Sequence, residues 1–147
     1  MTDLFIVAAE RSGDDIGAAL IKDIKKLNTD CQIKGIGGEA MRSVGVPSLM
    51  DIEGLSILGF VEGLKHYPMI IKKVKLCVDE ILQSDAKAVV LIDSWGFMIR
   101  VAKRLKALGY SGKIVKYVAP QVWAMREGRA KILADATDLL LSIQPMD

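Results

Sequence analysis

The sequence predicts an α/β protein with a doubly wound, Rossmann-like parallel sheet of about six strands and helices on both faces. Short, continuously apolar runs such as Leu4–Ala9 and Lys87–Asp93 alternate with longer segments of helical periodicity. Continuous apolarity indicates strands that are covered on both faces, and this alternation is typical of parallel βαβ units. With 147 residues, we expect one domain spanning residues 1–147.

The first half of the chain contains three of the predicted strands. The first, Leu4–Ala9, is followed by a turn at residues 10–13 and by a helix over Asp14–Leu27, with an apolar stripe at Ile16, Ala19, Leu20, Ile24 and Leu27. A strand over Cys31–Ile36 then leads through a glycine-rich turn into a short helix over Glu39–Val44. Residues 46–50 are predicted to form an edge strand, where Pro47 is tolerable.

The second half begins with a long stretch over residues 51–84, which Pro68 divides into a short helix ending near His66 and a longer one over 68–82. After the central strand over 87–93, we predict helices over 96–108 and 124–134 and strands over 113–118 and 138–143. Gly109 is predicted to end the helix over 96–108. Because no helix follows the last strand, we expect the chain to be the N-terminal part of a longer protein.

Composition narrows the function classes. The formal net charge of +2 is too small to indicate nucleic-acid binding. Cys31 and Cys77 lie far apart, without partners at metal-ligand spacing, so both are predicted to be reduced, buried thiols, and we expect no metal and no cofactor. The sequence shows no signal-peptide pattern and no apolar run of about 18 residues, which favours the cytoplasm.

Asp93 is the leading candidate for chemistry. It ends the central strand and precedes Ser94, Trp95 and Gly96, and ligands of open α/β sheets bind at the carboxyl ends of strands. The alternative is that Asp93 caps the following helix. The loop after the next strand adds Pro120, a flat aromatic face at Trp123 and a guanidinium at Arg126, although surface solubility explains the basic residues equally well.

Two other turns carry candidate binding residues. Residues 10–15, which include Ser12, Gly13 and two aspartates, lack the spacing of a P-loop and suit sugar hydroxyls better than phosphate; a plain turn capped by Ser12 is the alternative. Gly35-x-Gly37-x-x-Ala40 fits a loose dinucleotide fingerprint but follows the second strand rather than the first. There we favour a glycine turn that lets a ligand or a neighbouring loop approach the backbone.

The stretch from Ile57 to Ile81 is more apolar than one helical stripe requires, and lysines surround it. Such a surface suits the boundary of an anionic membrane, whereas a core helix with solvated lysines is the alternative. His66, the only histidine of the chain, lies in this stretch and has no visible catalytic partners.

Six segments together resemble lipid-A-disaccharide synthases. Val7–Asp14 resembles their AGExSGD start, and Gly35–Met41 resembles their G-[VI]-x-G-x-x-M turn. Ile57–Glu62 is similar to their MG-[IF]-VEV segment and Leu91–Ser94 to their IDxPDF strand end. Tyr117–Ala124 resembles their specific YVSPxVWAW loop, and Ala136–Leu139 their ATD-[LH] strand. The matches run in order over essentially the whole chain.

The resemblance implies the N-terminal, acceptor-side half of a GT-B glycosyltransferase from a Gram-negative bacterium. Such enzymes join UDP-2,3-diacylglucosamine to 2,3-diacylglucosamine 1-phosphate (lipid X) with inversion and without metal, and release UDP. The implied location is peripheral, at the cytoplasmic face of the inner membrane, and a homodimer is left open. The C-terminal half, which binds most of the donor, is absent from this sequence.

The resemblance also implies residue roles. Asp93 would be the general base that takes the proton from the acceptor 6-hydroxyl. Substrate-binding positions would be Glu10, Ser12, Gly13, Asp14, Gly37, Gly38, Ser94, Pro120, Trp123 and Arg126. Positions facing the membrane or acyl chains would be Ile57, Leu58, Phe60, Val61, Leu64, Tyr67, Ile70 and Ile71.

The sequence departs from the family pattern at three places. Arg11 replaces a threonine, Met125 replaces a tryptophan, and Gly96 and Met98 replace an aspartate and an asparagine that follow the strand-end carboxylate. Two other functions therefore stay open: a stand-alone flavodoxin-like module for a nucleotide or phosphate, and an interaction domain without chemistry.

Overall fold

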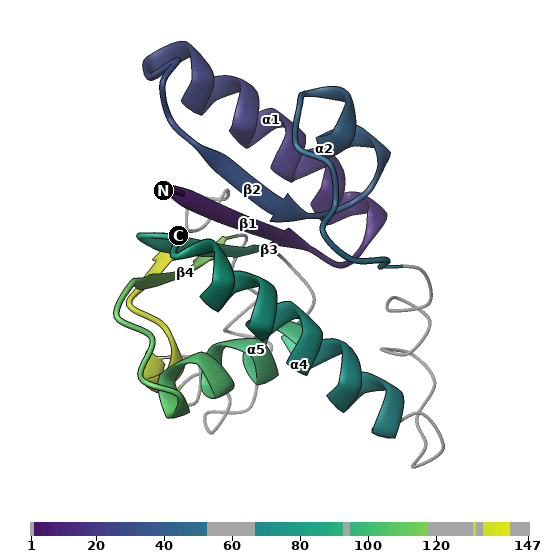
Figure 1. Cartoon of the computed structure of the whole chain (residues 1–147), viewed down its shortest axis with the longest axis vertical. Helices are drawn as coiled ribbons and strands as arrows, with labels where there is room; N and C mark the ends of the chain where they lie inside the picture. Colours follow the sequence, from purple (N-terminus) through teal and green to yellow (C-terminus); the bar gives the residue numbers. More distant parts are fainter. Residues whose placement is uncertain (1, 53–66, 93–94, 118–130, 132–133, 142–147) are drawn as a thin grey trace, which may run out of the picture.

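The computed structural model describes residues 2–52, 67–92, 95–117, 131 and 134–141. Within these residues, five parallel strands form one sheet in the order β2-β1-β3-β4-β5 (Figure 1). The strands are β1 (Leu4–Ala8), β2 (Ile33–Ile36), β3 (Ala88–Ile92), β4 (Lys113–Tyr117) and β5 (Leu139–Leu141). The helices are α1 (Arg11–Leu27), α2 (Glu39–Ser43), α4 (Tyr67–Ser84) and α5 (Trp95–Ala107). The predicted fold class is confirmed.

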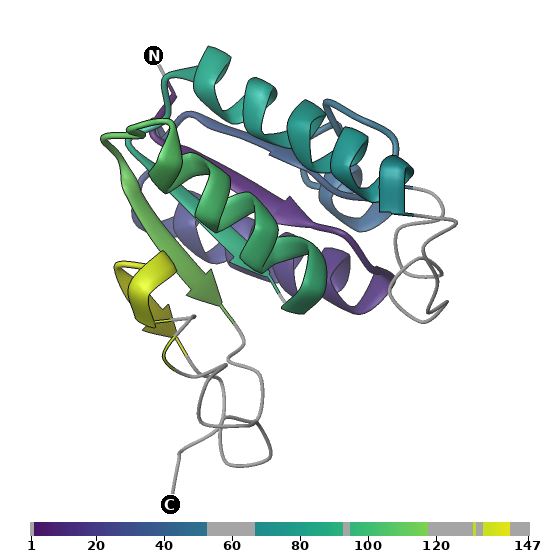
Figure 2. The ribbon, with the colours of Figure 1, turned by 90° about the horizontal axis from the view of Figure 1, so that it is seen from below.

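Helices cover both faces of the sheet, as the apolar strands predict. Figure 1 shows α1 and α2 on one face, and Figure 2 shows α4 and α5 side by side on the other. On the first face, Ile6, Ala8 and Ile92 pack with Ile21 of α1 and Met41 of α2. The larger cluster on the second face combines apolar side chains of β1, β3 and β4 with those of α4 and α5, among them Phe5, Val7, Leu91, Val78, Ile81, Val101 and Leu105.

Helix α1 differs from its prediction in two respects. It begins at Arg11, three residues earlier than predicted, so Ser12 and Gly13 are helical rather than part of a turn. Its buried face consists of Gly13, Asp14, Gly17, Ala18 and Ile21, whereas Leu27 of the predicted stripe is 89% exposed. Small residues allow the helix to approach α2 and the sheet closely: a Cβ at Gly17 would lie 2.9 Å from Sδ of Met41 in α2 and 3.4 Å from Cδ1 of Ile92 in β3.

The predicted edge strand over residues 46–50 is wrong as an extended element. A single isolated bridge joins Ser48 to Gly35, and the N–H of Leu49 donates to the carbonyl of Gly35 over 3.0 Å. Pro47 has no N–H to donate, which limits ladder formation here. Residues 124–130 of the predicted helix and 142–143 of the predicted last strand lie outside the described residues, as does the short helix before His66.

Candidate functional site

The site follows from the order of the strands. From β1 the chain crosses over α1 to β2, whereas from β3 it crosses over α5 to β4 on the other side. The neighbouring strands β1 and β3 therefore flank the topological switch point, where the connections that leave their carboxyl ends diverge. Ala8 pairs in register with Ile92, so the turn that begins α1 lies beside the end of β3.

Gly13 brings the first turn of α1 against the end of β3. A Cβ at Gly13 would lie 3.5 Å from Cγ2 of Ile92 and 3.7 Å from its carbonyl oxygen, which is ordinary contact. Glu10 is the N-cap residue, in an extended conformation and without a side-chain cap hydrogen bond, and Ser12 in the first turn of α1 is exposed. Ser12 is therefore inside the helix, and the alternative in which it caps the helix is wrong.

Asp14 joins the first turn of α1 to the turn before α2. Its carboxylate is buried, with the residue 5% exposed. Oδ1 accepts the backbone N–H groups of Gly38 (2.8 Å) and Met41 (3.0 Å), and Oδ2 accepts that of Ala40 (2.8 Å). Both oxygens thus cap α2 from another helix, a contact between segments 24 to 27 residues apart. The role of Asp14 as a sugar ligand stays a prediction.

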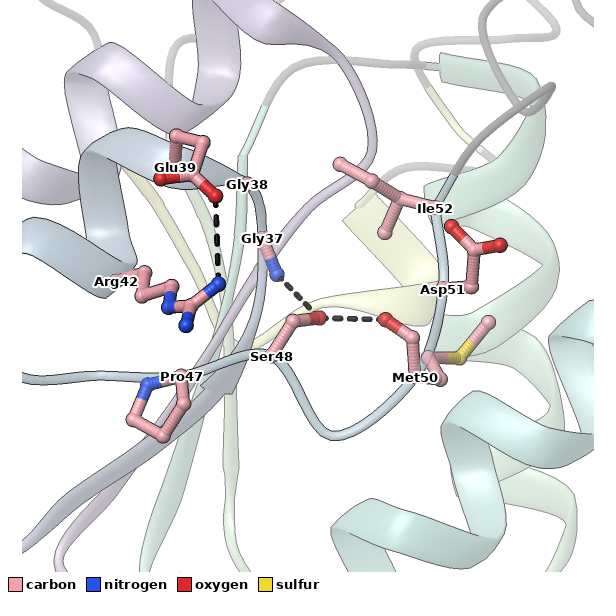
Figure 3. A pocket seen from close by; sticks show the side chains of 9 residues that line it. All are labelled: Gly37, Gly38, Glu39, Arg42, Pro47, Ser48, Met50, Asp51 and Ile52. Atoms are coloured by element: carbon pink, nitrogen blue, oxygen red, sulfur yellow. Dashed lines mark hydrogen bonds and ion pairs between the residues drawn. The ribbon is translucent and has the colours of Figure 1, made fainter.

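A pocket of about 520 Å³ opens beside this glycine turn (Figure 3). The predicted binding residues Gly37 and Gly38 form one wall, next to Glu39 and Arg42 of α2, and Pro47, Ser48 and residues 50–52 form the opposite wall. The N–H of Gly37 donates to Oγ of Ser48 over 3.0 Å, and that hydroxyl donates to the carbonyl of Met50 over 2.5 Å. The first bond joins the two walls, and the second holds the Ser48 hydroxyl within its own wall.

The structure brings together the predicted residues of the first two turns. Gly13 contacts the end of β3, and Asp14 contacts the turn that holds Gly37 and Gly38. Asp93 directly follows Ile92, the last residue of β3, but lies outside the described residues. The other predicted positions outside the described residues are Ser94, Pro120, Trp123 and Arg126.

The predicted membrane surface is described only for its C-terminal part. Ile70 packs against the core, so it belongs to the buried side of α4, whereas Ile71 is 40% and Met69 51% exposed. Of Tyr67 only the backbone is described. The predicted positions outside the described residues are Ile57, Leu58, Phe60, Val61 and Leu64. Among the described residues, no helix is both long and apolar enough to cross a membrane.

Two carboxylates of the described residues, Asp3 and Asp138, have a lowered pKa and lie at the opposite, amino-terminal edge of the sheet. The N–H of Gln32 donates to Asp3 over 2.8 Å and, with Lys87, lowers the pKa of this carboxylate. The N–H of Ile114 donates to Asp138 over 2.8 Å and, with Lys106, lowers the pKa of Asp138. These carboxylates precede β1 and β5 and stabilise strand starts, so their shifts point to structure rather than to the ligand site.

Sequence reasoning missed three residues near the carboxyl ends of the strands. Arg42 and Ser48 line the pocket although neither belongs to a motif that the sequence singles out. Lys116 of β4 is 2% exposed, although the two lysines of this strand suggest a solvent-exposed face. Desolvation of a buried lysine costs several kcal/mol, which contacts of the ammonium group must offset. Lys116 lies two residues after buried Ile114, so both residues belong to the strand face that α5 covers. This spacing is the signal that could have identified Lys116 as buried.

A model of the lipid-A-disaccharide synthetase family matches residues 4–147, which is nearly the whole chain. The chain belongs to this family. The match includes the turn that holds Asp14, the glycine turn before α2 and the end of β3. The family assignment that the sequence motifs imply is therefore confirmed.

Curated members of the family agree with this assignment. The chain is 42% identical to lipid-A-disaccharide synthase of Paramagnetospirillum magneticum over 97% of its length, and 39% identical to that of Rhodopseudomonas palustris over 98%. It is 40% identical to that of Chlamydia abortus over 97%. The chain spans 37% of the length of the first two relatives and 23% of the third.

Proposed function

We propose that this chain is the acceptor- and membrane-binding portion of a glycosyltransferase of lipid A biosynthesis. The reaction joins UDP-2,3-diacylglucosamine to 2,3-diacylglucosamine 1-phosphate (lipid X) and releases UDP. The observation that carries this proposal is the convergence of the β1, β2 and β3 carboxyl ends in a chain that belongs to the lipid-A-disaccharide synthetase family. Residues 1–147 act as one domain, and the remaining length of the relatives supplies most of the donor site.

Asp93 is the proposed general base. It follows β3 at the topological switch point, where the acceptor hydroxyl lies between the turns that leave β1 and β3. Its carboxylate takes the proton from the 6-hydroxyl while that oxygen attacks the anomeric carbon of the donor, whose bond to UDP breaks. In this proposal Ser12 and Gly13 line the acceptor sugar, and Trp123 and Arg126 lie at the mouth of the cleft. The other substrate-binding positions are Glu10, Gly37, Gly38, Ser94 and Pro120.

A chimeric enzyme tests this reaction. Residues 4–147 replace the matching segment of the Paramagnetospirillum magneticum relative, and UDP release from synthetic lipid X and UDP-diacylglucosamine is measured. We expect turnover, with a loss of roughly 10²–10⁴-fold in kcat for Asp93→Asn, which is the usual contribution of a general base. Asp135→Asn, at an exposed carboxylate, is the matched control. Full activity of Asp93→Asn would refute its role, and a chimera that folds without turnover would refute the reaction.

The proposed location is the cytoplasmic face of the inner membrane, with α4 against the lipid. Met69 and Ile71 are exposed apolar side chains, and Lys72 and Lys75 are exposed beside them. In this proposal these lysines contact anionic lipid, with roughly 1 kcal/mol gained per lysine.

The stand-alone nucleotide- or phosphate-binding module gains no support at the glycine turn. The N–H groups of Gly37, Gly38, Ala40 and Met41 already donate to side chains of the same chain. A phosphate at this turn would have to displace Ser48 or the carboxylate of Asp14.

A further inference from the structure

The glycine turn between β2 and α2 has the architecture of a phosphate loop, yet its anion position is filled by the chain itself. In phosphate loops, backbone N–H groups between a strand and a helix point at the ligand. Here the N–H groups of Gly38, Ala40 and Met41 point at the carboxylate of Asp14, over 2.8–3.0 Å. Asp14 is 5% exposed and reaches the turn from α1.

The glycines of the turn are explained by this internal anion together with Met41. A Cβ at Gly38 would lie 2.8 Å from Oδ2 of Asp14, and one at Gly37 would meet Sδ of Met41 and lie 3.2 Å from Oδ1 of Asp14. Gly38 has extended backbone angles, φ −116° and ψ −150°, that any residue adopts. Its missing side chain therefore serves the approach of Asp14 and not an unusual backbone conformation.

The pocket beside this turn has one hydrogen-bond acceptor side chain and one donor side chain at its rim. Glu39 and Arg42 of α2 are 89% and 70% exposed, and their charged atoms lie 3.5 Å apart, a weak surface pair (Figure 3). A hydroxyl group can donate to the carboxylate of Glu39 while it accepts from the guanidinium of Arg42. Pro47, Met50 and Ile52 contribute apolar surface to the same pocket.

These charges disfavour a phosphate in the pocket. The carboxylates of Glu39 and Asp51 line it, and Asp14 lies directly behind its glycine wall; the opposing cations are the guanidinium of Arg42 and the ammonium of Lys73, which donates to the carbonyl of Asp51 over 3.0 Å. Like charges at this separation repel, and the backbone donors of Gly37 and Gly38 that would compensate are engaged elsewhere. An uncharged ring with several hydroxyls avoids this repulsion and can place its C–H face on the apolar side chains.

We propose that this pocket binds an uncharged, hydroxyl-bearing pyranose ring, and that Asp14 is the positioning residue that holds its glycine wall and keeps phosphate out. The identification of the ring with the glucosamine of an acylated acceptor rests on the function proposed above. The exclusion of phosphate and the role of Asp14 rest on the contacts of this chain alone.

The ligand class is tested by two-dimensional NMR of the ¹⁵N-labelled chain, titrated with N-acetylglucosamine and, separately, with inorganic phosphate. We expect the sugar to shift the amide signals of Gly37, Ser48 and Ile52 in a saturable manner, and phosphate to leave those of Gly38, Ala40 and Met41 unmoved. Arg42→Gln should weaken the sugar response several-fold, whereas Arg104→Gln, at an exposed arginine of α5, should not. Phosphate-induced shifts at the turn, or no sugar response up to the solubility limit, would overturn the proposal.

The role of Asp14 is tested by removing its carboxylate. In Asp14→Ala the three N–H donors lose their acceptor, so formate or phosphate should bind there, raise the melting temperature of the variant and leave that of the wild type unchanged. Gly38→Ala is the second variant, because it keeps the carboxylate of Asp14 while the added methyl group displaces it. We expect this variant to fold and to bind the sugar several-fold more weakly. Equal sugar affinity in Gly38→Ala, or no anion response in a folded Asp14→Ala, would refute the positioning role.

These outcomes separate the pocket from the reaction. Sugar binding at the pocket in a protein whose chimera fails to release UDP would retain the pocket and reject the proposed reaction. A chimera that turns over, while the sugar leaves the pocket signals unmoved, would retain the reaction and reject the pocket.

Discussion

Asp14 and Gly38 form a matched pair. The N–H of Gly38 donates to Oδ1 of Asp14 over 2.8 Å, and a Cβ on Gly38 would lie only 2.8 Å from the other carboxylate oxygen. The two residues belong to separate motifs by which the sequence resembles its family, one after β1 and one after β2. The contact explains why an aspartate in the first motif accompanies a glycine in the second.

A double-mutant cycle tests this pair. Asp14→Ala leaves buried N–H donors without an acceptor and should lower the free energy of unfolding by about 2–4 kcal/mol. Gly38→Ala alone should cost about 1–3 kcal/mol, because the added methyl overpacks the carboxylate. In the Asp14→Ala background the cost of Gly38→Ala should fall by half or more, as measured by urea denaturation.

Gly45→Ala is the matched control for this cycle. Gly45 has φ +95° and no atom within 4 Å of an added Cβ, so its substitution strains the backbone without a steric contact. The cost, about 1 kcal/mol, should be the same with and without Asp14. Additive costs for Gly38→Ala and Asp14→Ala would contradict a direct contact between them.

Most of the fold could be predicted from the sequence because its strands are short apolar runs and its helices have clear periodicity. The runs around Ile6 and Val90 fix two central strands, and the order of strands and helices fixes their parallel direction. The edge was harder: residues 46–50 form one bridge rather than a strand, since an edge segment has a partner on one side only. The start of α1 was missed because glycine and serine in a first turn read as a loop.

The candidate site was predictable in outline and not in its contacts. The sequence singled out the segments Ser12–Asp14 and Gly37–Gly38 as candidate binding residues, which stays a prediction, and foresaw that a neighbouring segment could approach the glycines. It could not show that Asp14 is that neighbour, because the contact joins residues 24 positions apart. Arg42 and Ser48 were missed because they belong to no motif and reach the pocket through tertiary packing.

Cys77 should be chemically silent in the native protein. It is fully buried in the core between α4 and the sheet, and burial raises the pKa of its thiol, with a smaller contribution from Glu80. The thiolate is the reactive form, so a disulfide reagent at neutral pH should label Cys77 only as fast as the protein unfolds. Peptide mass spectrometry after timed labelling measures this rate. Labelling of Cys77 that is independent of urea concentration below the transition would contradict its burial.

The lysines of α4 should determine binding to anionic vesicles. Lys72→Gln combined with Lys75→Gln should weaken binding to vesicles of phosphatidylcholine and phosphatidylglycerol by roughly 30-fold at low salt, at about 1 kcal/mol per lysine. Lys22→Gln with Lys103→Gln removes the same charge from exposed positions on α1 and α5 and serves as the control. Co-sedimentation at increasing salt measures both. An equal loss in the two double variants would indicate that net charge, and not the α4 surface, governs binding.

Acid should destabilise the protein through Asp138. The N–H of Ile114 and then Lys106 hold the pKa of this carboxylate below its ordinary value of 3.8 in the folded state. A depressed folded pKa means that the stabilisation is complete above pH 3.8 and is lost as the pH falls from there through the folded pKa. Urea denaturation across this range should therefore show a falling free energy of unfolding, and Asp138→Asn should flatten part of the slope. Lys106→Gln should flatten it less, because the backbone hydrogen bond is the larger cause. Parallel pH profiles for the wild type and Asp138→Asn would show that the hydrogen bond from Ile114 to Asp138 contributes no pH-dependent stability.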